Sequence, residues 1–222
     1  MKKLDNVSHH TEMEEYGESA NQKHCHRGKS SERYLNKDII LKELNIRSGQ
    51  TILDAGCGNG YMSKEFSKLL NNTGKVYALD PDKAALEILK QETKGTNIET
   101  IEGNITKRTQ IKGSSVDLIY LSTVFHGFSE GEIHGFQKEV KRLLKPNAVL
   151  SIVEIKKEKT PFGPPLHIRF SPDELKETIP LIPKSLVDVG EYFYMQTFVK
   201  GLGPNLLALS PGNEINLAIN LV

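Results

Sequence analysis

The chain has 222 residues, a length that suits one domain with a sizeable core. Its formal net charge is +1, which gives no electrostatic case for nucleic acid as a partner. No apolar run is long enough to span a bilayer, and the N-terminal residues lack the apolar core of a signal peptide. With two cysteines and no disulfide framework, we expect a cytoplasmic protein without a membrane span.

Residues 1–30 are polar and show no apolar periodicity, so we predict a flexible arm. The arm contains His9, His10, His24, Cys25 and His26. These residues lack the paired spacing of a zinc site, so we predict no metal site there, and a lid over a bound molecule is a further possible role. Apolar residues recurring on one side predict a helix at about 31–44.

The most informative segment follows at 51–60, where an apolar run leads into Asp54 and then into Gly56, Gly58 and Gly60. Glycine adopts backbone angles closed to other residues and lets a ligand approach the main chain. Backbone amides at the following helix N-terminus offer donors to a ligand carboxylate. The dinucleotide fingerprint would need a glycine where Tyr61 stands, so the pattern favours another cofactor.

The alternation of strands and helices continues along the chain. Strands are predicted at 74–80, 98–101, 116–121, 149–155, 186–189 and 192–199, and helices after Asp82, Ser129 and Ser171. This order predicts an α/β fold, a single doubly wound, mostly parallel sheet with helices on both faces. Residues 201–222 hold no lysine or arginine and one acid, Glu214, and form an atypical tail that is either a partner-binding extension or an artefact of the reading frame.

The motif Asp54-x-Gly56-x-Gly58-x-Gly60 resembles the first motif of the class I S-adenosylmethionine-dependent methyltransferases. The nearest resemblance is to the small-molecule branch that includes the ubiquinone and menaquinone C-methyltransferases. It covers about residues 35–200 and implies a seven-stranded Rossmann-like sheet whose last strand runs antiparallel. It also implies S-adenosylmethionine (SAM) as cofactor, S-adenosylhomocysteine as product, and a small-molecule methyl acceptor.

Asp80 closes the strand after the glycine loop, at the place where an acid contacts ribose hydroxyls in nucleotide-binding folds. The alternative is that Asp80 only begins a turn. The resemblance implies that Asn104, which stands where the family more often has aspartate, lies near the adenine and that Ser122 borders the amino-acid end. The predicted cofactor-binding residues are Asp54, Gly56, Cys57, Gly58, Gly60, Asp80, Pro81, Asn104, Ile105 and Ser122.

The methyl group of a sulfonium is already activated, so its transfer depends mainly on a nucleophile held close, and proximity and orientation supply about 7–11 kcal/mol. A base helps only where the acceptor must lose a proton. Histidine side chains titrate near neutrality, so His126 is the candidate catalytic base, with a hydrogen-bonded wall residue as the alternative. The predicted substrate-side residues are Tyr34, Phe125, His167 and Arg169.

Two other functions are compatible with the same pattern. One is a nicotinamide-dependent oxidoreductase on a similar sheet, and the other is a catalytically silent cofactor-binding protein that regulates a partner through its arm or tail. Core packing is the alternative for Phe125, and a surface ion pair for Arg169. The sequence leaves the acceptor, the methylated atom and the oligomeric state open.

Overall fold

The computed structural model describes residues 31–71 and 73–202. The predicted arm at 1–30, with its histidines, Cys25 and its proposed lid role, lies outside the described residues, as does nearly all of the predicted tail. No helix in the described part of the chain is long and apolar enough to cross a membrane. The same residues contain no cluster of histidine, cysteine, aspartate and glutamate side chains suited to a metal ion.

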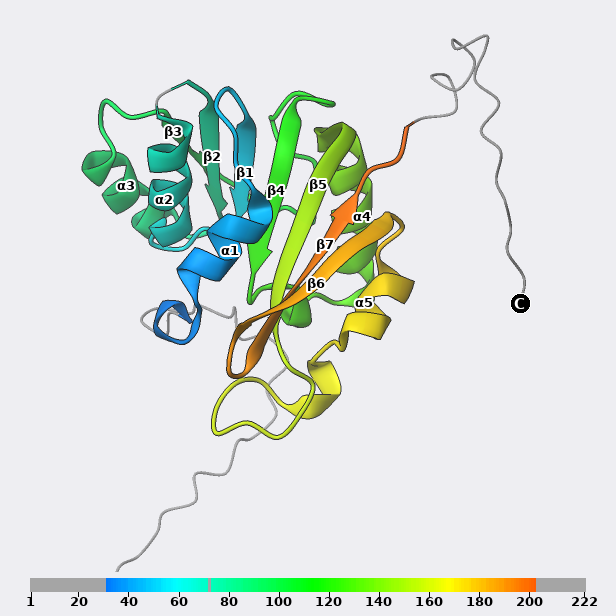
Figure 1. The fold of residues 1–222 in the computed structure, drawn as a ribbon. Helices are drawn as coiled ribbons and strands as arrows, with labels where there is room; N and C mark the ends of the chain where they lie inside the picture. Colours follow the sequence, from blue (N-terminus) through cyan, green and yellow to red (C-terminus); the bar gives the residue numbers. More distant parts are fainter. Residues whose placement is uncertain (1–30, 72, 203–222) are drawn as a thin grey trace, which may run out of the picture.

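Seven strands form one sheet in the order β3-β2-β1-β4-β5-β7-β6 (Figure 1). They are β1 (Thr51–Ala55), β2 (Lys75–Asp80), β3 (Ile98–Glu102), β4 (Val116–Ser122), β5 (Leu144–Ile155), β6 (Ile182–Gly190) and β7 (Phe193–Val199). The pairs among β1 to β5 are parallel, whereas β7 runs antiparallel to both β5 and β6. The predicted seven-stranded α/β sheet is confirmed, and it is a mixed sheet because β7 is inserted in the opposite direction.

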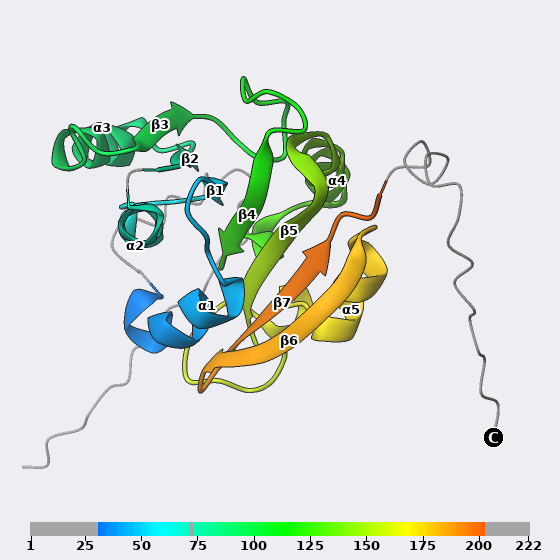
Figure 2. The same ribbon diagram turned by 45° about the horizontal axis from the view of Figure 1, so that its top comes forward.

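Helices cover both faces of the sheet (Figures 1 and 2). They are η1 (Glu32–Tyr34), α1 (Lys37–Leu44), α2 (Tyr61–Leu70), α3 (Lys83–Glu92), η2 (Phe125–Gly127), α4 (Glu130–Leu143), η3 (Leu166–Ile168) and α5 (Pro172–Thr178), where η denotes a 3-10 helix. Ile40 of α1 and Phe66 of α2 belong to the core on one face, and Phe136 of α4 and Leu175 of α5 to the core on the other.

The predicted helix starts are confirmed by their caps. Asp82 accepts hydrogen bonds from the first turn of α3, and Ser129 and Ser171 form capping boxes at α4 and α5. The helix predicted at 31–44 is instead divided into η1 and α1. The Asn36 side chain accepts from the N–H of Ile39, which gives α1 a start of its own.

The central strands β1, β4 and β5 are buried on both faces, which explains why they are nearly continuous apolar runs. Four polar side chains stand at or near the carboxyl ends of β1, β2, β4 and β5. Asp54 stands near the end of β1, Asp80 at the end of β2, Ser122 at the end of β4 and Glu154 near the end of β5. Because these strands are parallel, the four residues lie along one edge of the sheet, where α/β folds bind ligands.

Candidate active site

The glycine loop between β1 and α2 contains three residues in the left-handed region. Gly56, Gly58 and Gly60 have φ of 73°, 54° and 73°, which glycine adopts without steric cost. A Cβ at Gly56 would lie 2.7 Å from Val124 Cγ2, and one at Gly60 would overlap the side chain of Leu89. A Cβ at Gly58 would meet nothing within 4 Å. Two glycines therefore let neighbours pack closely, and the third leaves main chain open to a ligand.

Asp80 ties this loop to β2. Its Oδ2 accepts from the N–H of Gly58 at 2.9 Å, and its Oδ1 accepts from the N–H of Asp82 at 2.8 Å. The side chain is largely buried, with a residue exposure of 9%. A carboxylate has about four lone-pair sites, so roughly two stay free for hydroxyl donors. Asp80 therefore shapes the loop and keeps the capacity to bind a ligand.

The N–H groups of four loop residues, Gly56, Cys57, Gly58 and Gly60, are engaged inside the protein and are not free to bind a ligand carboxylate. The N–H groups of Gly56 and Cys57 donate to the carbonyl of Leu79, and that of Gly60 donates to the carbonyl of Cys57. The loop offers close approach at Gly58 rather than a row of free donors. The physical reason is that a tight turn satisfies its own buried amides.

Asp54 faces the interior and is 3% exposed. Its Oδ2 accepts from the hydroxyl of Ser63 on α2 at 2.6 Å. Burial raises the pKa of Asp54 from its ordinary 3.8 to about 7, against the opposing effect of the Ser63 hydrogen bonds. Asp54 therefore anchors the start of α2 to β1, and its charge changes near neutral pH.

Other predicted cofactor residues have local structural roles. Cys57 is buried against Leu86 and Leu89 of α3, and burial raises the pKa of its thiol, so it is an unreactive packing residue. Asn104 accepts from the N–H of Thr106 at 2.9 Å through Oδ1, so its carbonyl closes a turn. Ile105 is buried, whereas Pro81 is exposed between β2 and α3.

Two buried hydroxyls at the end of β4 have no hydrogen-bond partner in the described part of the chain, those of Tyr120 and Ser122. The two groups are near enough for Ser122 to lower the pKa of Tyr120, which burial raises more strongly, but they do not meet in good hydrogen-bond geometry. Tyr120 lies opposite Asp54 in the pairing of β4 with β1. Unpaired buried hydroxyls are costly, and they mark a place where a ligand supplies the missing bond.

Thr123, just after β4, has φ of 56°. A β-branched residue in the left-handed region is a conformational outlier, and such outliers cluster at functional sites. Its N–H donates to the carbonyl of Val153 at 2.8 Å, and its hydroxyl lies 3.3 Å from that of Ser31. This strained turn directs the following Val124 against Gly56.

His126 in η2 is paired with Glu154 of β5. The ring Nδ1 of His126 lies 2.7 Å from Glu154 Oε2, and the backbone N–H of His126 donates to Oε1 at 3.3 Å. The Glu154 side chain is fully buried, and that of His126 is 12% exposed. The structure thus brings the predicted base next to a carboxylate that is 28 residues away in the sequence.

Tyr34 lies against the loop after β5. The rings of Tyr34 and Phe162 stack at 4.2 Å, and Phe162 also contacts the ring of Tyr192 edge-on at 5.4 Å. The main chain of Tyr34 is so close to Gly190 that a Cβ there would overlap its carbonyl oxygen. His167 is exposed in η3, next to this loop.

The other two predicted substrate residues have different surroundings from those expected. Phe125 is fully buried and packs against Phe128, Phe136 and Phe170 at 5.6, 5.5 and 4.9 Å, so it belongs to the core. Arg169 is buried under its own loop and is not placed to clamp an anion. Its nitrogen atoms donate to the carbonyls of Lys156, Glu158, Phe162 and Pro164 and to the hydroxyl of Thr160.

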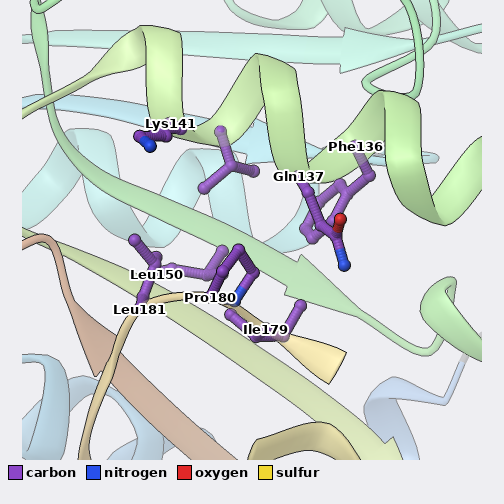
Figure 3. Close-up of a pocket in the computed structure, with 8 residues that line it drawn as sticks. Phe136, Gln137, Lys141, Leu150, Ile179, Pro180 and Leu181 are labelled. Carbon is purple, nitrogen blue, oxygen red and sulfur yellow. The ribbon is translucent and has the colours of Figure 1, made fainter. Parts of the chain in front are cut away.

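A small apolar cleft, with a cavity volume of about 10 Å³, lies away from this site, between α4 and the segment that follows α5 (Figure 3). It is lined by Phe136, Gln137, Val140, Lys141, Leu150, Ile179, Pro180 and Leu181. No lining residue comes from the loops after β1, β2 or β4. The cleft is therefore separate from the candidate active site.

Comparisons with known proteins agree with this geometry. A family model described as "Methyltransferase domain" matches residues 52–147. Demethylmenaquinone methyltransferase of Staphylococcus saprophyticus is 28% identical over 55% of this chain and 52% of that protein. Probable ribosomal RNA small subunit methyltransferase A of Pyrococcus furiosus is 36% identical over 32% of this chain and 26% of that protein. The chain spans about half the length, or less, of these curated relatives.

A solved structure, that of a SAM-dependent methyltransferase from Aquifex aeolicus, superimposes with a TM-score of 0.68 and 28% identity, over 76% of this chain and 92% of that chain. Residues 52–147 carry a methyltransferase domain, and the fold is that of a SAM-dependent methyltransferase. The predicted family and enzyme class are confirmed, and SAM, the predicted cofactor, is the cofactor of this family. All three relatives are named as methyltransferases, which gives the nicotinamide-dependent alternative no support.

The residues of this methyltransferase fit SAM. Gly58 leaves open space beside the main chain, and Asp80 keeps acceptor sites for a pair of hydroxyls. Ser122 presents a buried hydroxyl that lacks a partner among the described residues. These three features lie on one edge of the sheet, where α/β folds bind ligands.

Sequence reasoning did not identify three residues of this site: Ser63, Thr123 and Glu154. Glu154 left a usable signal, because it is the one charged residue in the run 148–155 and stands near the carboxyl end of that strand. Ser63 and Thr123 left none. A serine in an amphipathic helix and a threonine after a strand are ordinary residues until their contacts are known.

Proposed function

We propose that this methyltransferase transfers a methyl group from SAM to a small-molecule acceptor and releases S-adenosylhomocysteine. The observation that carries the proposal is the joint placement of open main chain at Gly58 and a carboxylate with spare acceptor capacity at Asp80, which binds that same loop. When bound, SAM supplies a methyl group on a positively charged sulfur that is ready for attack.

The cofactor-binding residues have distinct roles in this proposal. Asp80 accepts from the ribose hydroxyls, and Gly58 lets the cofactor approach the main chain. Ser122 and the buried Asp54 provide polar groups at the amino-acid end, where an ammonium favours the charged form of Asp54. Asn104, with Ile105 beside it, borders the adenine, through the amide nitrogen that its turn leaves free.

The acceptor side is bordered by the aromatic rings of Tyr34 and Phe162, with His126 at the end of β4. This mixture of apolar walls and one polar group suits an aromatic small molecule better than a charged polymer. The overall charge of +1 gives no electrostatic argument for RNA as the acceptor. The match to the ribosomal RNA relative covers 32% of this chain, so the small-molecule acceptor is the better supported of the two.

Calorimetry with SAM, S-adenosylhomocysteine and NAD tests the cofactor. We expect the two adenosyl amino acids to bind and NAD not to bind. Asp80→Asn removes one acceptor oxygen and should lower the affinity for S-adenosylhomocysteine at least tenfold. Asp188→Asn, which changes an exposed carboxylate paired with Lys156 on β6, should have no effect. Tight binding of NAD without binding of the adenosyl compounds would overturn the proposal.

Turnover separates an enzyme from a silent cofactor-binding protein. The protein is incubated with SAM and a panel of hydroxylated aromatic, amine and thiol acceptors, and the release of S-adenosylhomocysteine is measured. We expect release with at least one small aromatic acceptor. Binding of SAM without release across the panel would favour the regulatory alternative.

A further inference from the structure

Among the residues that the structure describes, the Glu154 carboxylate forms hydrogen bonds with His126 alone. Both of its oxygen atoms face His126, one at the ring Nδ1 and the other at the backbone N–H. Within residues 31–71 and 73–202, no lysine or arginine forms an ion pair with it. The hydrogen bonds of Glu154 therefore fix the position and orientation of the His126 imidazole.

Placing a carboxylate here is costly. Leu150 and Ile152 precede Glu154 on the same face of β5 and are fully buried in the core. A buried charge without a strong partner is unfavourable by several kcal/mol in general. Tyr194 stands opposite Glu154 on β7 but donates its hydroxyl to the carbonyl of Phe170. A neutral side chain could hold η2 in place at a lower cost in free energy. The negative charge of Glu154 therefore indicates a functional role.

The contact determines which nitrogen of His126 carries its proton. An ionised carboxylate only accepts hydrogen bonds, so Nδ1 must be the protonated nitrogen. In the neutral imidazole Nε2 then keeps its lone pair and is a proton acceptor. No described residue forms a hydrogen bond with Nε2, and the ring stays 12% exposed at the end of β4, beside the cofactor-binding edge.

We propose that Glu154 is a positioning residue that keeps His126 in the Nδ1–H form, so that Nε2 removes a proton from the methyl acceptor. This inference rests on the proposed function and specifies its substrate class as aromatic or enolic hydroxyl compounds. The acceptor O–H bond breaks, an N–H bond forms at Nε2, and the electron pair stays on the acceptor, whose oxygen or ortho carbon (the α-carbon of an enolate) becomes the nucleophile. The resulting imidazolium lies beside the Glu154 carboxylate, which stabilises its charge.

The first test reads the proton on His126 directly. The ¹⁵N NMR signals of the histidine side chains are recorded at pH 8, with His126→Asn for assignment. We expect Nδ1 to be the protonated nitrogen in the parent protein. Glu154→Leu, which removes the acceptor, should abolish this preference, whereas Glu154→Gln should retain part of it through its amide oxygen. Glu139→Gln, which changes another buried carboxylate, serves as the control and should leave the His126 signals unchanged.

A parent protein that carries the proton on Nε2, or a Glu154→Leu protein with an unchanged and folded His126 spectrum, would overturn the proposal. Circular dichroism establishes whether each variant is folded. If Glu154→Leu does not fold, the proposal can still be tested. The protonated nitrogen is read in the parent protein once His126→Asn has assigned the His126 signals, and Glu154→Gln then shows whether the preference weakens.

The second test uses two probes that differ in their need for a base, 1,4-dihydroxynaphthalene and thiophenol. The thiol is ionised at pH 8 without help. Loss of a general base costs about 10²–10⁴-fold in rate. We therefore expect His126→Asn to lower kcat for the hydroxylated ring by about 100-fold and for the thiol by less than threefold. Glu154→Gln should lower only the former, by about tenfold, and the double variant should be no slower than His126→Asn.

An equal loss of kcat for both probes would overturn the role of His126 as a base. The pair of His126 and Glu154 would then have a structural role only. Binding of S-adenosylhomocysteine by calorimetry is measured in parallel and should stay within twofold of the parent in both variants. A parent protein that binds no S-adenosylhomocysteine contradicts the proposed function, and this outcome is distinct from the NMR result, which needs no cofactor.

Discussion

Asp54 and Asp80 lie at the ends of adjacent parallel strands, yet their surroundings give them different tasks. Asp80 receives two main-chain N–H bonds and keeps acceptor sites at its accessible side. Asp54 is enclosed between β1 and α2, receives the hydroxyl of Ser63, and has a pKa of about 7 because it is desolvated. The same side chain thus keeps free acceptor sites in one position and is a buried, titrating anchor in the other.

The titration of Asp54 predicts how stability depends on pH. The folded state holds this proton up to about pH 7, whereas the unfolded chain releases it near 3.8. Between these values the folded state binds more protons, so the free energy of unfolding should fall as pH rises from about 4 to 7 and level off above that. The size is on the order of a few kcal/mol.

Urea denaturation of the ligand-free protein at pH 5, 6, 7 and 8 measures this slope. Asp54→Asn keeps the shape and removes the titration, so its free energy of unfolding should depend less steeply on pH than that of the parent. Asp188→Asn, on the exposed edge strand, should follow the parent curve. An Asp54→Asn protein with the slope of the parent would show that Asp54 does not titrate in this range.

At the scale of elements, each loop at the carboxyl edge of the sheet is held by its own contacts. The glycine loop is fixed by close packing at Gly56 and Gly60 and by Asp80. The loop after β5 is fixed from beneath by the guanidinium of Arg169. Loops that must hold a ligand in a defined place are held by the rigid sheet below them.

Alanine at Gly58 and at Gly60 should separate binding from stability. At both positions alanine must adopt left-handed backbone angles, which should lower the free energy of unfolding by about 1–2 kcal/mol. At Gly60 the new methyl also overlaps the fully buried Leu89, so Gly60→Ala should lose about 1–3 kcal/mol more by thermal or urea denaturation. At Gly58 the methyl enters open space, so Gly58→Ala should chiefly lower the affinity for S-adenosylhomocysteine, as measured by calorimetry. Equal affinity of Gly58→Ala and the parent would remove Gly58 from the cofactor site.

Removing the guanidinium of Arg169 should loosen the loop after β5. Arg169→Leu leaves several carbonyl groups without donors, and we expect a loss of about 2–4 kcal/mol in the free energy of unfolding. Limited proteolysis should cut at 156–164 faster than in the parent, while affinity for S-adenosylhomocysteine is kept. Arg47→Leu, which changes an exposed arginine, provides the control. Unchanged proteolysis in Arg169→Leu would exclude this anchoring role.

At the scale of the whole molecule, one sheet couples the two halves of the site. Asp54 and Asp80 belong to β1 and β2, His126 follows β4 in η2, Glu154 belongs to β5, and the pairing of β1 with β4 joins the two halves directly. A ligand bound at this edge therefore contacts elements from both halves of the chain. Its binding stabilises the fold by mass action, since the unfolded chain has no such edge.

S-adenosylhomocysteine at about 100 times its dissociation constant should stabilise the protein by about 2.7 kcal/mol. For a chain of this size each kcal/mol raises the melting temperature by about 2–4 °C, so we expect a rise of about 5–10 °C. Differential scanning fluorimetry measures it, with NAD at the same concentration as the control. The shift should fall to about half or less for Asp80→Asn at the same ligand concentration. A comparable shift with NAD would contradict the assignment of the cofactor.

The amino-acid sequence by itself determined the order of strands and helices, the caps at Asp82, Ser129 and Ser171, and the glycine loop followed by Asp80. Each of these depends on neighbours a few residues apart, and local backbone preferences act over that range. Only the tertiary structure placed Glu154 against His126, Phe125 inside the core and Arg169 beneath its loop. Those contacts depend on which strands lie side by side and in which register, and hydrophobicity along the chain does not specify the partner of a single buried charge.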